Sequence, residues 1–112
     1  MNVNTTNLKL CLTELSDIDF QRRAWLAASG PEVSSFSELV SQLFDDTGLT
    51  DALEDARIEE AVGLEAAAKL RALDNAVAKI DQSLPPGALI NLPAMVQIRE
   101  LARQALEAIQ QH

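Results

Sequence analysis

The chain contains a single histidine, a single cysteine and no tyrosine in its 112 residues. The histidine is the last residue, His112, at a position where chains usually fray. Ser/His/Asp and Cys/His catalysis both need an imidazole held beside the nucleophile, so we expect neither here. The lone Cys11 cannot form an intramolecular disulfide, and one cysteine with one histidine cannot complete a structural zinc site.

Long apolar runs and stripes of basic residues are also missing. No run approaches the roughly 18 apolar residues that span a bilayer, and residues 1–6 lack the basic start of a secretory signal. Proteins that bind nucleic acid usually carry a Lys/Arg stripe that faces the phosphates, and this chain has none. We expect a cytoplasmic protein that binds neither a membrane nor nucleic acid.

Residues that favour strands are scarce, whereas alanine and leucine are abundant, and this composition favours helix. A hydrophobic content of 47% with 23% charged residues is ordinary for a globular protein, and the length is close to the commonest domain size. We predict one all-α domain over residues 1–112 with about five helices. Residues 1–49 would form compact, orthogonal helices, followed by a long antiparallel helical hairpin over residues 50–112.

Two helices are predicted before residue 30. An i, i+3, i+4, i+7 pattern indicates a first helix whose start is marked by Thr5 or Thr6. Ser16, followed three residues later by Asp19, indicates the N-terminus of a second helix over residues 17–28. The apolar residues of the first pattern are Leu8, Cys11, Leu12 and Leu15, which makes Cys11 a small buried hydrophobe.

A third helix is predicted after the Gly30-Pro31 stop. Ser35 and Glu38 form a capping box, because each side chain can bond to the free backbone N–H of the other residue. Gly48 suits the position just beyond the end of the helix. The apolar stripe of this helix is Phe36, Leu39, Val40, Leu43 and Phe44.

Residues 50–84 contain no proline and are dense in Ala, Leu, Glu and Lys, so they predict a long helical segment. A straight helix of this length would measure about 50 Å, which exceeds the width of a compact domain of this size. We therefore expect either two helices with a bend near Gly63, or one helix whose end packs on a second chain.

The second arm of the predicted hairpin follows a turn at Pro85-Pro86-Gly87. Pro93 is tolerated in the first turn of a helix, so it indicates where this arm begins. Apolar stripes with three- and four-residue spacing on both sides of the turn predict the antiparallel pairing. They are Leu70, Leu73, Val77, Ile80 and Leu84 in the first arm, and Met95, Ile98, Ala102, Ala105 and Ile109 in the second.

The net charge of −8 lies entirely in the N-terminal part of the chain. Residues 1–60, the acidic half, contain twelve acidic and four basic residues, whereas residues 61–112, the neutral half, contain five of each. An acidic surface promotes solubility, and it also suits a cationic partner.

The densest group of acids follows Thr50 and contains the candidate metal ligands Asp51, Glu54, Asp55 and Glu59. On one helix these would share a face, where like charges repel by a few tenths of a kcal/mol per pair. Helical nucleotide pyrophosphatases hold Mg²⁺ with such acids, but they need a second acidic pair that faces the first. The acids after residue 60 do not form such a second pair, so a solvated acidic face is the simpler interpretation. We expect no cofactor.

Asp45, Asp46 and Trp25 are further candidates for function. Two acids at a helix C-terminus oppose the macrodipole, so Asp45 and Asp46 either cap the turn beside Gly48 or form a contact patch for a cation. Trp25, with the neighbouring Arg22-Arg23, is either a core residue or part of a binding surface.

Three groups of residues resemble a family of small, uncharacterised bacterial proteins. They are Leu15-Ser16-Asp17, then Phe20-Gln21 with Trp25-Leu26, and finally Leu43-Phe44-Asp45-Asp46-Thr47-Gly48-Leu49. The resemblance covers about residues 8–55, and the C-terminal part matches only in length and character. It implies a bacterial origin and a helical fold, and it provides no activity, catalytic residue or cofactor.

The leading hypothesis is a non-enzymatic interaction module whose acidic half binds a basic protein, as an immunity protein or antitoxin would bind a cationic toxin. One alternative is a Mg²⁺-dependent nucleotide pyrophosphohydrolase, and another is a purely structural homodimer built on the two apolar stripes. The candidate partner-binding residues are Asp45, Asp46, Asp55, Glu59, Glu60 and Trp25.

Overall fold

The computed structural model describes residues 3–26, 35–55 and 57–111, and within these ranges it contains helices and no strand. The prediction of an all-α protein is therefore confirmed for this part of the chain. Eight α-helices and one π-helical turn are found there rather than about five helices. The elements are α1 (Thr5–Ser16), α2 (Ile18–Leu26), α3 (Phe36–Ser41), η1 (Gln42–Asp46), α4 (Leu49–Leu53), α5 (Arg57–Val62), α6 (Leu64–Ala78), α7 (Pro86–Ile90) and α8 (Pro93–Gln111).

Side-chain caps fix the starts of the first two helices. The Oδ1 atom of Asn4 accepts a hydrogen bond of 3.1 Å from the backbone N–H of Asn7 at the start of α1. Asp17, and not Ser16 as predicted, caps α2, because its Oδ1 accepts from two backbone N–H groups at 3.0 and 3.1 Å. The hydroxyl of Ser16 instead donates to a carbonyl of α1. The predicted end of the second helix and the Gly30-Pro31 stop lie outside the described residues.

The third predicted helix is present, but its second half changes type. Ser35 caps α3 as predicted, since its Oγ accepts from the backbone N–H of Glu38 at 3.1 Å. The chain then continues into the wider π-helical turn η1, with Leu43 and Phe44 buried. Gly48 follows with φ 79°, a left-handed conformation that glycine adopts without strain, so its predicted place at the helix end is confirmed.

The long predicted helix over residues 50–84 is broken at three places. Gly63 adopts φ 91° and ψ 163° between α5 and α6, which confirms a bend at this residue. A second break lies between α4 and α5, where the Oδ1 of Asp55 accepts from the N–H of Arg57. The helix also stops at Ala78, and Asp81 then accepts from the following serine in a turn. Asp and Ser side chains that bond to nearby backbone compete with helix, which explains both additional breaks.

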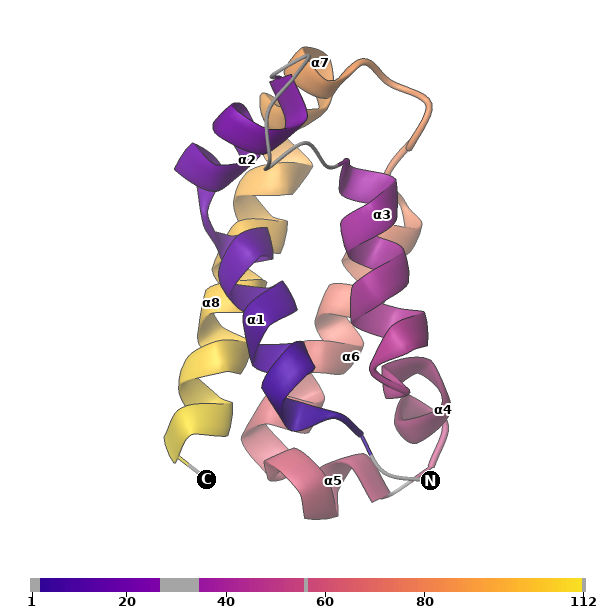
Figure 1. Cartoon of the computed structure of the whole chain (residues 1–112). Coiled ribbons are helices and arrows are strands. Elements are labelled where there is room, and N and C mark those ends of the chain that lie inside the picture. The colour runs from indigo at the N-terminus through magenta and orange to yellow at the C-terminus, as the bar shows by residue number, and fades with distance from the viewer. Residues whose placement is uncertain (1–2, 27–34, 56, 112) are drawn as a thin grey trace.

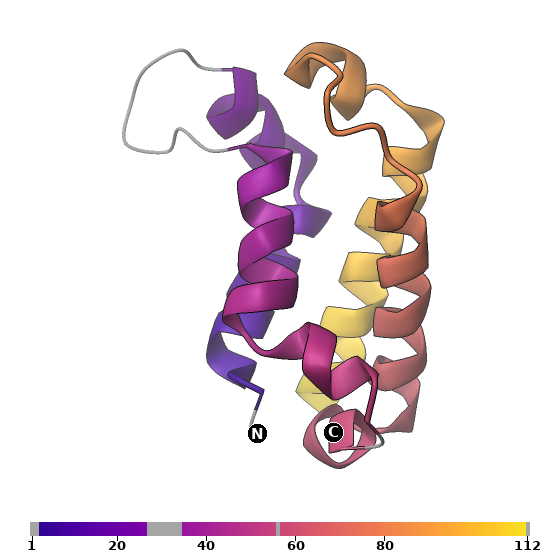
Figure 2. The same ribbon diagram turned by 90° about the vertical axis from the view of Figure 1, so that its right-hand side faces the viewer.

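The helices form two layers that are closed at both ends (Figures 1 and 2). One layer contains α1 and α3, which run side by side in opposite directions rather than crossing at right angles as predicted. The other contains α6 and α8, which also run in opposite directions. Helices α2 and α7 lie at one end, and α4 and α5 lie at the other (Figure 1). The radius of gyration, 13.6 Å, is close to the roughly 13 Å expected for a compact chain of this length.

Helix α8 has the most extensive packing, against α6 on one side and α1 on the other. The two arms are joined through α7, which begins at Pro86, so Pro85-Pro86-Gly87 is not a simple hairpin turn. Most residues of the two apolar stripes are fully or almost fully buried within the single chain. In this single chain the two stripes therefore pack into the core rather than forming an exposed surface, and the homodimer stays a prediction. Among the described residues, no helix is both long and apolar enough to cross a membrane.

A buried glutamine joins four of these helices. The side chain of Gln21 is fully buried, and its Nε2 donates to the carbonyl of Leu15 at 2.7 Å, near the end of α1. Its Oε1 accepts from the guanidinium of Arg99 on α8, which also donates to the carbonyl of Ile90 on α7. Burial, followed by repulsion from Arg22, lowers the pKa of Arg99. This polar junction holds the end of α1 against α8.

Candidate functional site

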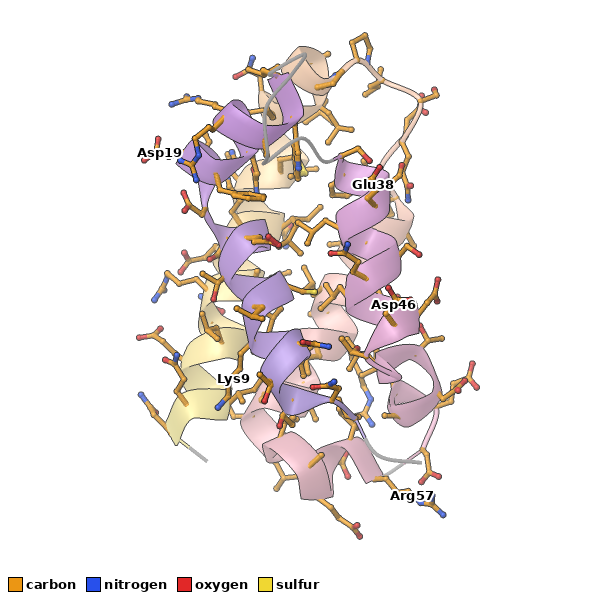
Figure 3. All side chains as sticks on the ribbon, in the orientation of Figure 1. Lys9, Asp19, Glu38, Asp46 and Arg57 are labelled. Atoms are coloured by element: carbon orange, nitrogen blue, oxygen red, sulfur yellow. The ribbon has the colours of Figure 1, made fainter. Side chains whose placement is uncertain are left out.

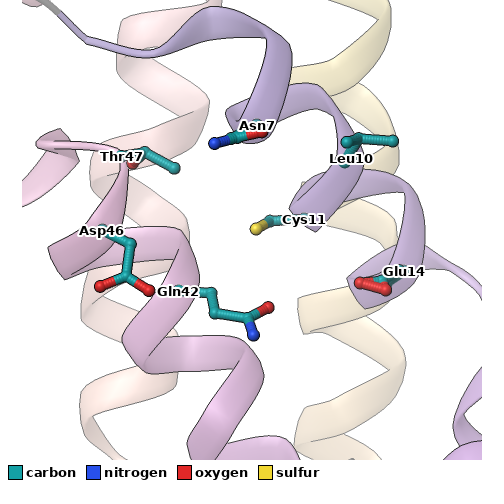
Figure 4. A pocket seen from close by; sticks show the side chains of 7 residues that line it. All are labelled: Asn7, Leu10, Cys11, Glu14, Gln42, Asp46 and Thr47. Atoms are coloured by element: carbon teal, nitrogen blue, oxygen red, sulfur yellow. The ribbon is translucent and has the colours of Figure 1, made fainter. Parts of the chain in front are cut away.

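A pocket of about 290 Å³ lies between α1 and η1 (Figure 4). Helix α1 forms one wall with residues spaced i, i+3, i+4 and i+7, which lie on one face of a helix. The π-helical turn and the residue after it form the opposite wall. The lining residues are Asn7, Leu10, Cys11 and Glu14 on the first wall, and Gln42, Asp46 and Thr47 on the second.

The second wall is held in place by backbone bonds around Thr47. Its Oγ1 donates to the carbonyl of Leu43 at 2.6 Å and accepts from the N–H of Leu49 at 3.3 Å. Its carbonyl accepts from the N–H of Asn4, which directly precedes α1, at 3.0 Å. This last bond ties the two walls together at one end of the pocket. Turns of the π type are rare and occur often at functional sites, which draws attention to Gln42 and Asp46.

The pocket has a negative electrostatic field. The Cys11 side chain is 6% exposed, and burial, with the nearby charges of Glu14 and then Asp46, raises its pKa to about 11. Burial also raises the pKa of Glu14. Within the described residues, neither Glu14 nor Asp46 has an ion-pair partner. The pocket therefore contains two uncompensated carboxylates.

The position of Cys11 decides which chemistry the thiol can perform. Figure 4 shows its sulfur directed into the space between α1 and η1. A thiol with a pKa of about 11 is protonated at neutral pH, and only the thiolate is a strong nucleophile. The prediction that Cys11 is a small buried residue is confirmed, although it also lines the pocket. The arrangement suits binding rather than covalent chemistry.

The candidate metal ligands are not brought together. Asp51 lies on α4 and Glu54 follows this helix, whereas Glu59 lies on α5 beyond the break, so the predicted shared face does not exist. Asp55 pairs with Arg57 at 3.4 Å, and Glu59 pairs with Arg71 at 3.0 Å. In the part of the chain that the structure describes, no three His, Cys, Asp or Glu residues are placed to hold a metal ion.

The other predicted site residues are divided between surface and core. Asp45 is exposed and accepts a hydrogen bond of 3.4 Å from Ser41, and Glu60 is exposed on α5. Trp25 is only 5% exposed, and its ring packs edge-on against Phe36 at 5.8 Å between centroids. The interpretation of Trp25 as a core residue is therefore confirmed, and its place among the partner-binding candidates stays a prediction. Figure 3 shows Asp19, Glu38 and Asp46 at separate positions, on α2, α3 and η1.

Comparison with models of known protein families, with curated proteins and with solved structures found no match to this chain. The resemblance of residues 8–55 to a bacterial family therefore stays a prediction. In the structure, its two most distinctive parts have structural roles. Trp25 fills the core, and the segment from Leu43 to Leu49 forms the π-helical turn and the beginning of α4.

Sequence reasoning missed Asn7, Glu14 and Gln42 as site residues. A signal was present on α1, where Asn7 and Glu14 follow the same spacing as the apolar stripe and lie beside it. The opposite wall had no such signal, because nothing local indicates that residues 42–46 form a π-helical turn facing α1.

Proposed function

We propose that this protein is a non-enzymatic interaction module whose acidic half binds a basic protein partner. The observation that carries this proposal is the pocket between α1 and η1, where Glu14 and Asp46 have no cation opposite them within the described residues. Uncompensated carboxylates near a pocket favour a ligand of opposite charge. Such a partner would neutralise charge that the fold itself leaves unpaired.

The unpaired acids of η1 support the same proposal. Elsewhere in the acidic half, Asp55 pairs with Arg57 and Glu59 pairs with Arg71. In the acidic half, Asp45 and Asp46 are adjacent, exposed and without an ion pair among the described residues. The negative field of the acidic half would steer a cationic partner toward this surface and increase the association rate.

A concrete form of the proposal is an immunity protein or antitoxin that covers a basic toxin. Association driven by opposite charges becomes slower as ionic strength increases, because salt screens exposed charges beyond about 10 Å at 0.1 M. The hydrolase alternative needs several carboxylates that converge on one metal ion, and no observation in the described residues supports it.

A pull-down from a bacterial lysate tests the proposal. The bait variant reverses the charge at Asp45 and Asp46, and the matched control reverses Glu65 and Asp74, two exposed acids of α6. Basic proteins should be captured by the unmodified protein and by the control, and lost with Asp45→Lys/Asp46→Lys. Circular dichroism should show that both variants remain folded. An identical set of captured proteins for all three baits would contradict the proposal.

A further inference from the structure

We propose that the pocket between α1 and η1 receives one arginine side chain of the basic partner. This inference rests on the proposed function and identifies the group that the partner inserts. Pockets for small molecules usually measure about 300–1,000 Å³, so a pocket of about 290 Å³ is at the lower limit. It is suited to one side chain rather than to a nucleotide or a larger cofactor.

The charges of the pocket select a cation. Glu14 lies on the α1 wall and Asp46 on the η1 wall, and both charges act on Cys11 between these walls. The thiol is more than nine-tenths buried, is directed into the pocket and forms no hydrogen bond with any described residue (Figure 4). A cation placed in this space would interact favourably with both carboxylates and would meet a weak sulfur acceptor rather than a competing base.

The hydrogen-bonding groups favour a guanidinium over an ammonium. The side-chain amides of Asn7 and Gln42 extend into the space between the walls and form no hydrogen bond with another described residue (Figure 4). Their oxygens and the two carboxylates provide acceptors on both sides of the pocket. Arginine presents five N–H donors in a planar fork, whereas lysine concentrates three donors at one point. Acceptors on opposite walls therefore match arginine better.

The remaining features fit the aliphatic part of an arginine. Leu10 lines the pocket and is 60% exposed, although it is a large apolar residue. Arginine side chains place their methylene groups along apolar surface while the charged end reaches polar groups. A compact metal ion fits less well, because the described acids and thiol are not arranged as a metal-binding group. The pocket thus provides an apolar edge together with a carboxylate on each wall.

NMR titration of the intact protein tests this inference. It uses three amino-acid derivatives whose amino and carboxyl groups are blocked, so that only the side chain can carry a charge. The probes are Nα-acetylarginine amide, Nα-acetyllysine amide and the neutral isostere Nα-acetylcitrulline amide, each at constant ionic strength. The arginine probe should shift the amide resonances of Cys11, Glu14, Gln42 and Asp46 in a saturable manner, with a Kd in the millimolar range. The lysine probe should bind several-fold more weakly, and the citrulline probe should cause no saturable shift.

Substitutions of the two carboxylates test which groups bind the arginine probe. Glu14→Gln and Asp46→Asn should each weaken the arginine probe roughly tenfold, because a hydrogen bond to a charged group contributes one or more factors of ten. Asp74→Asn, which removes one exposed acid from α6, should leave its Kd unchanged. The bound probe should also lower the pKa of Cys11 below about 11, measured from its ¹³Cβ shift, because a cation offsets both carboxylates.

Three results would overturn the inference: equal shifts with citrulline, an equal or higher affinity for lysine, or saturable shifts of the same residues with Mg²⁺ alone. The pull-down distinguishes this failure from failure of the proposed function. If basic proteins still bind Glu14→Gln and Asp46→Asn as tightly as the unmodified protein, the acidic surface binds its partner without using the pocket. If the arginine probe binds but no basic protein is captured, the pocket is correct and the proposed function is wrong.

Discussion

The acidic half and the neutral half are similar in length but differ in the length and regularity of their helices. The neutral half contains the two longest helices, α6 with 15 residues and α8 with 19, and their apolar stripes fill the core. The acidic half is divided into short elements, of which only α1 reaches 12 residues, and it contains the π-helical turn and the pocket. The longest regular helices and the pocket are thus placed in different parts of one small fold.

The largest expected effect comes from removing buried leucines in each half. Leu73 on α6 and Leu43 in η1 are both fully buried. Leucine to alanine changes in cores cost about 2–5 kcal/mol, and the cost is higher where the surroundings cannot collapse into the cavity. We expect Leu73→Ala to cost more than Leu43→Ala, because α6 is held by long helical packing and η1 borders a pocket. Urea unfolding measures both free energies.

Leu64→Ala is the control for this comparison, since Leu64 is 77% exposed. Its effect on the free energy of unfolding should stay within about 0.5 kcal/mol. A cost for Leu43→Ala equal to or above that for Leu73→Ala would show that the acidic half is packed as tightly as the neutral half.

The second-largest expected effect is a loss of stability when Gly63 or Gly48 is replaced. Gly63 has φ 91° and ψ 163°, a region that is essentially restricted to glycine, so Gly63→Ala should cost about 1–3 kcal/mol. Gly48 has φ 79° and ψ 12°, a left-handed conformation that asparagine also tolerates. Gly48→Asn should therefore destabilise much less than Gly63→Asn in thermal unfolding. Equal losses at the two positions would contradict this assignment of the backbone.

Local signals in the sequence predicted what local physics determines. The cap at Ser35, the buried stripes and the two special glycines depend on residues within a few positions of each other, and the structure confirms them. The Gln21 junction was not predictable, because it depends on Arg99, 78 positions away. The break at Asp55 was not predicted, because the surrounding residues have a high helix propensity. The side chain of Asp55 nevertheless bonds to the backbone N–H of Arg57 and ends the helix there.

The site shows the same division between local and distant information. Asp46 was identified by its conflict with the helix macrodipole, which is a local property. Glu14 shares the spacing of the apolar stripe of α1, but that spacing does not show that the residue faces η1 across the pocket. A metal site formed by the acids from Asp51 to Glu59 requires one continuous helix, and the break between α4 and α5 removes that geometry.

The smallest expected effect is a pH dependence of opposite sign in the two halves. Burial raises the pKa of Glu14 in the folded protein, so its ionised form opposes folding at neutral pH. This penalty disappears as the pH falls through the folded pKa. Glu14→Gln should therefore raise the Tm slightly at pH 7 and lose this advantage in acid.

Glu100 provides the contrast, because hydrogen bonds from Arg103 and Gln104 lower its pKa from 4.5 to about 2. Its contribution to stability is complete above about pH 4.5 and is lost as the pH falls toward 2. Glu100→Gln should thus lower the Tm at pH 7 and have no effect near pH 2. The effect should be small and should shrink in high salt, since these groups are exposed to solvent. Thermal unfolding of both variants between pH 2 and pH 7 measures how the change in Tm depends on pH. A dependence of the same sign for Glu14→Gln and Glu100→Gln would mean that the pocket stabilises the ionised form of Glu14.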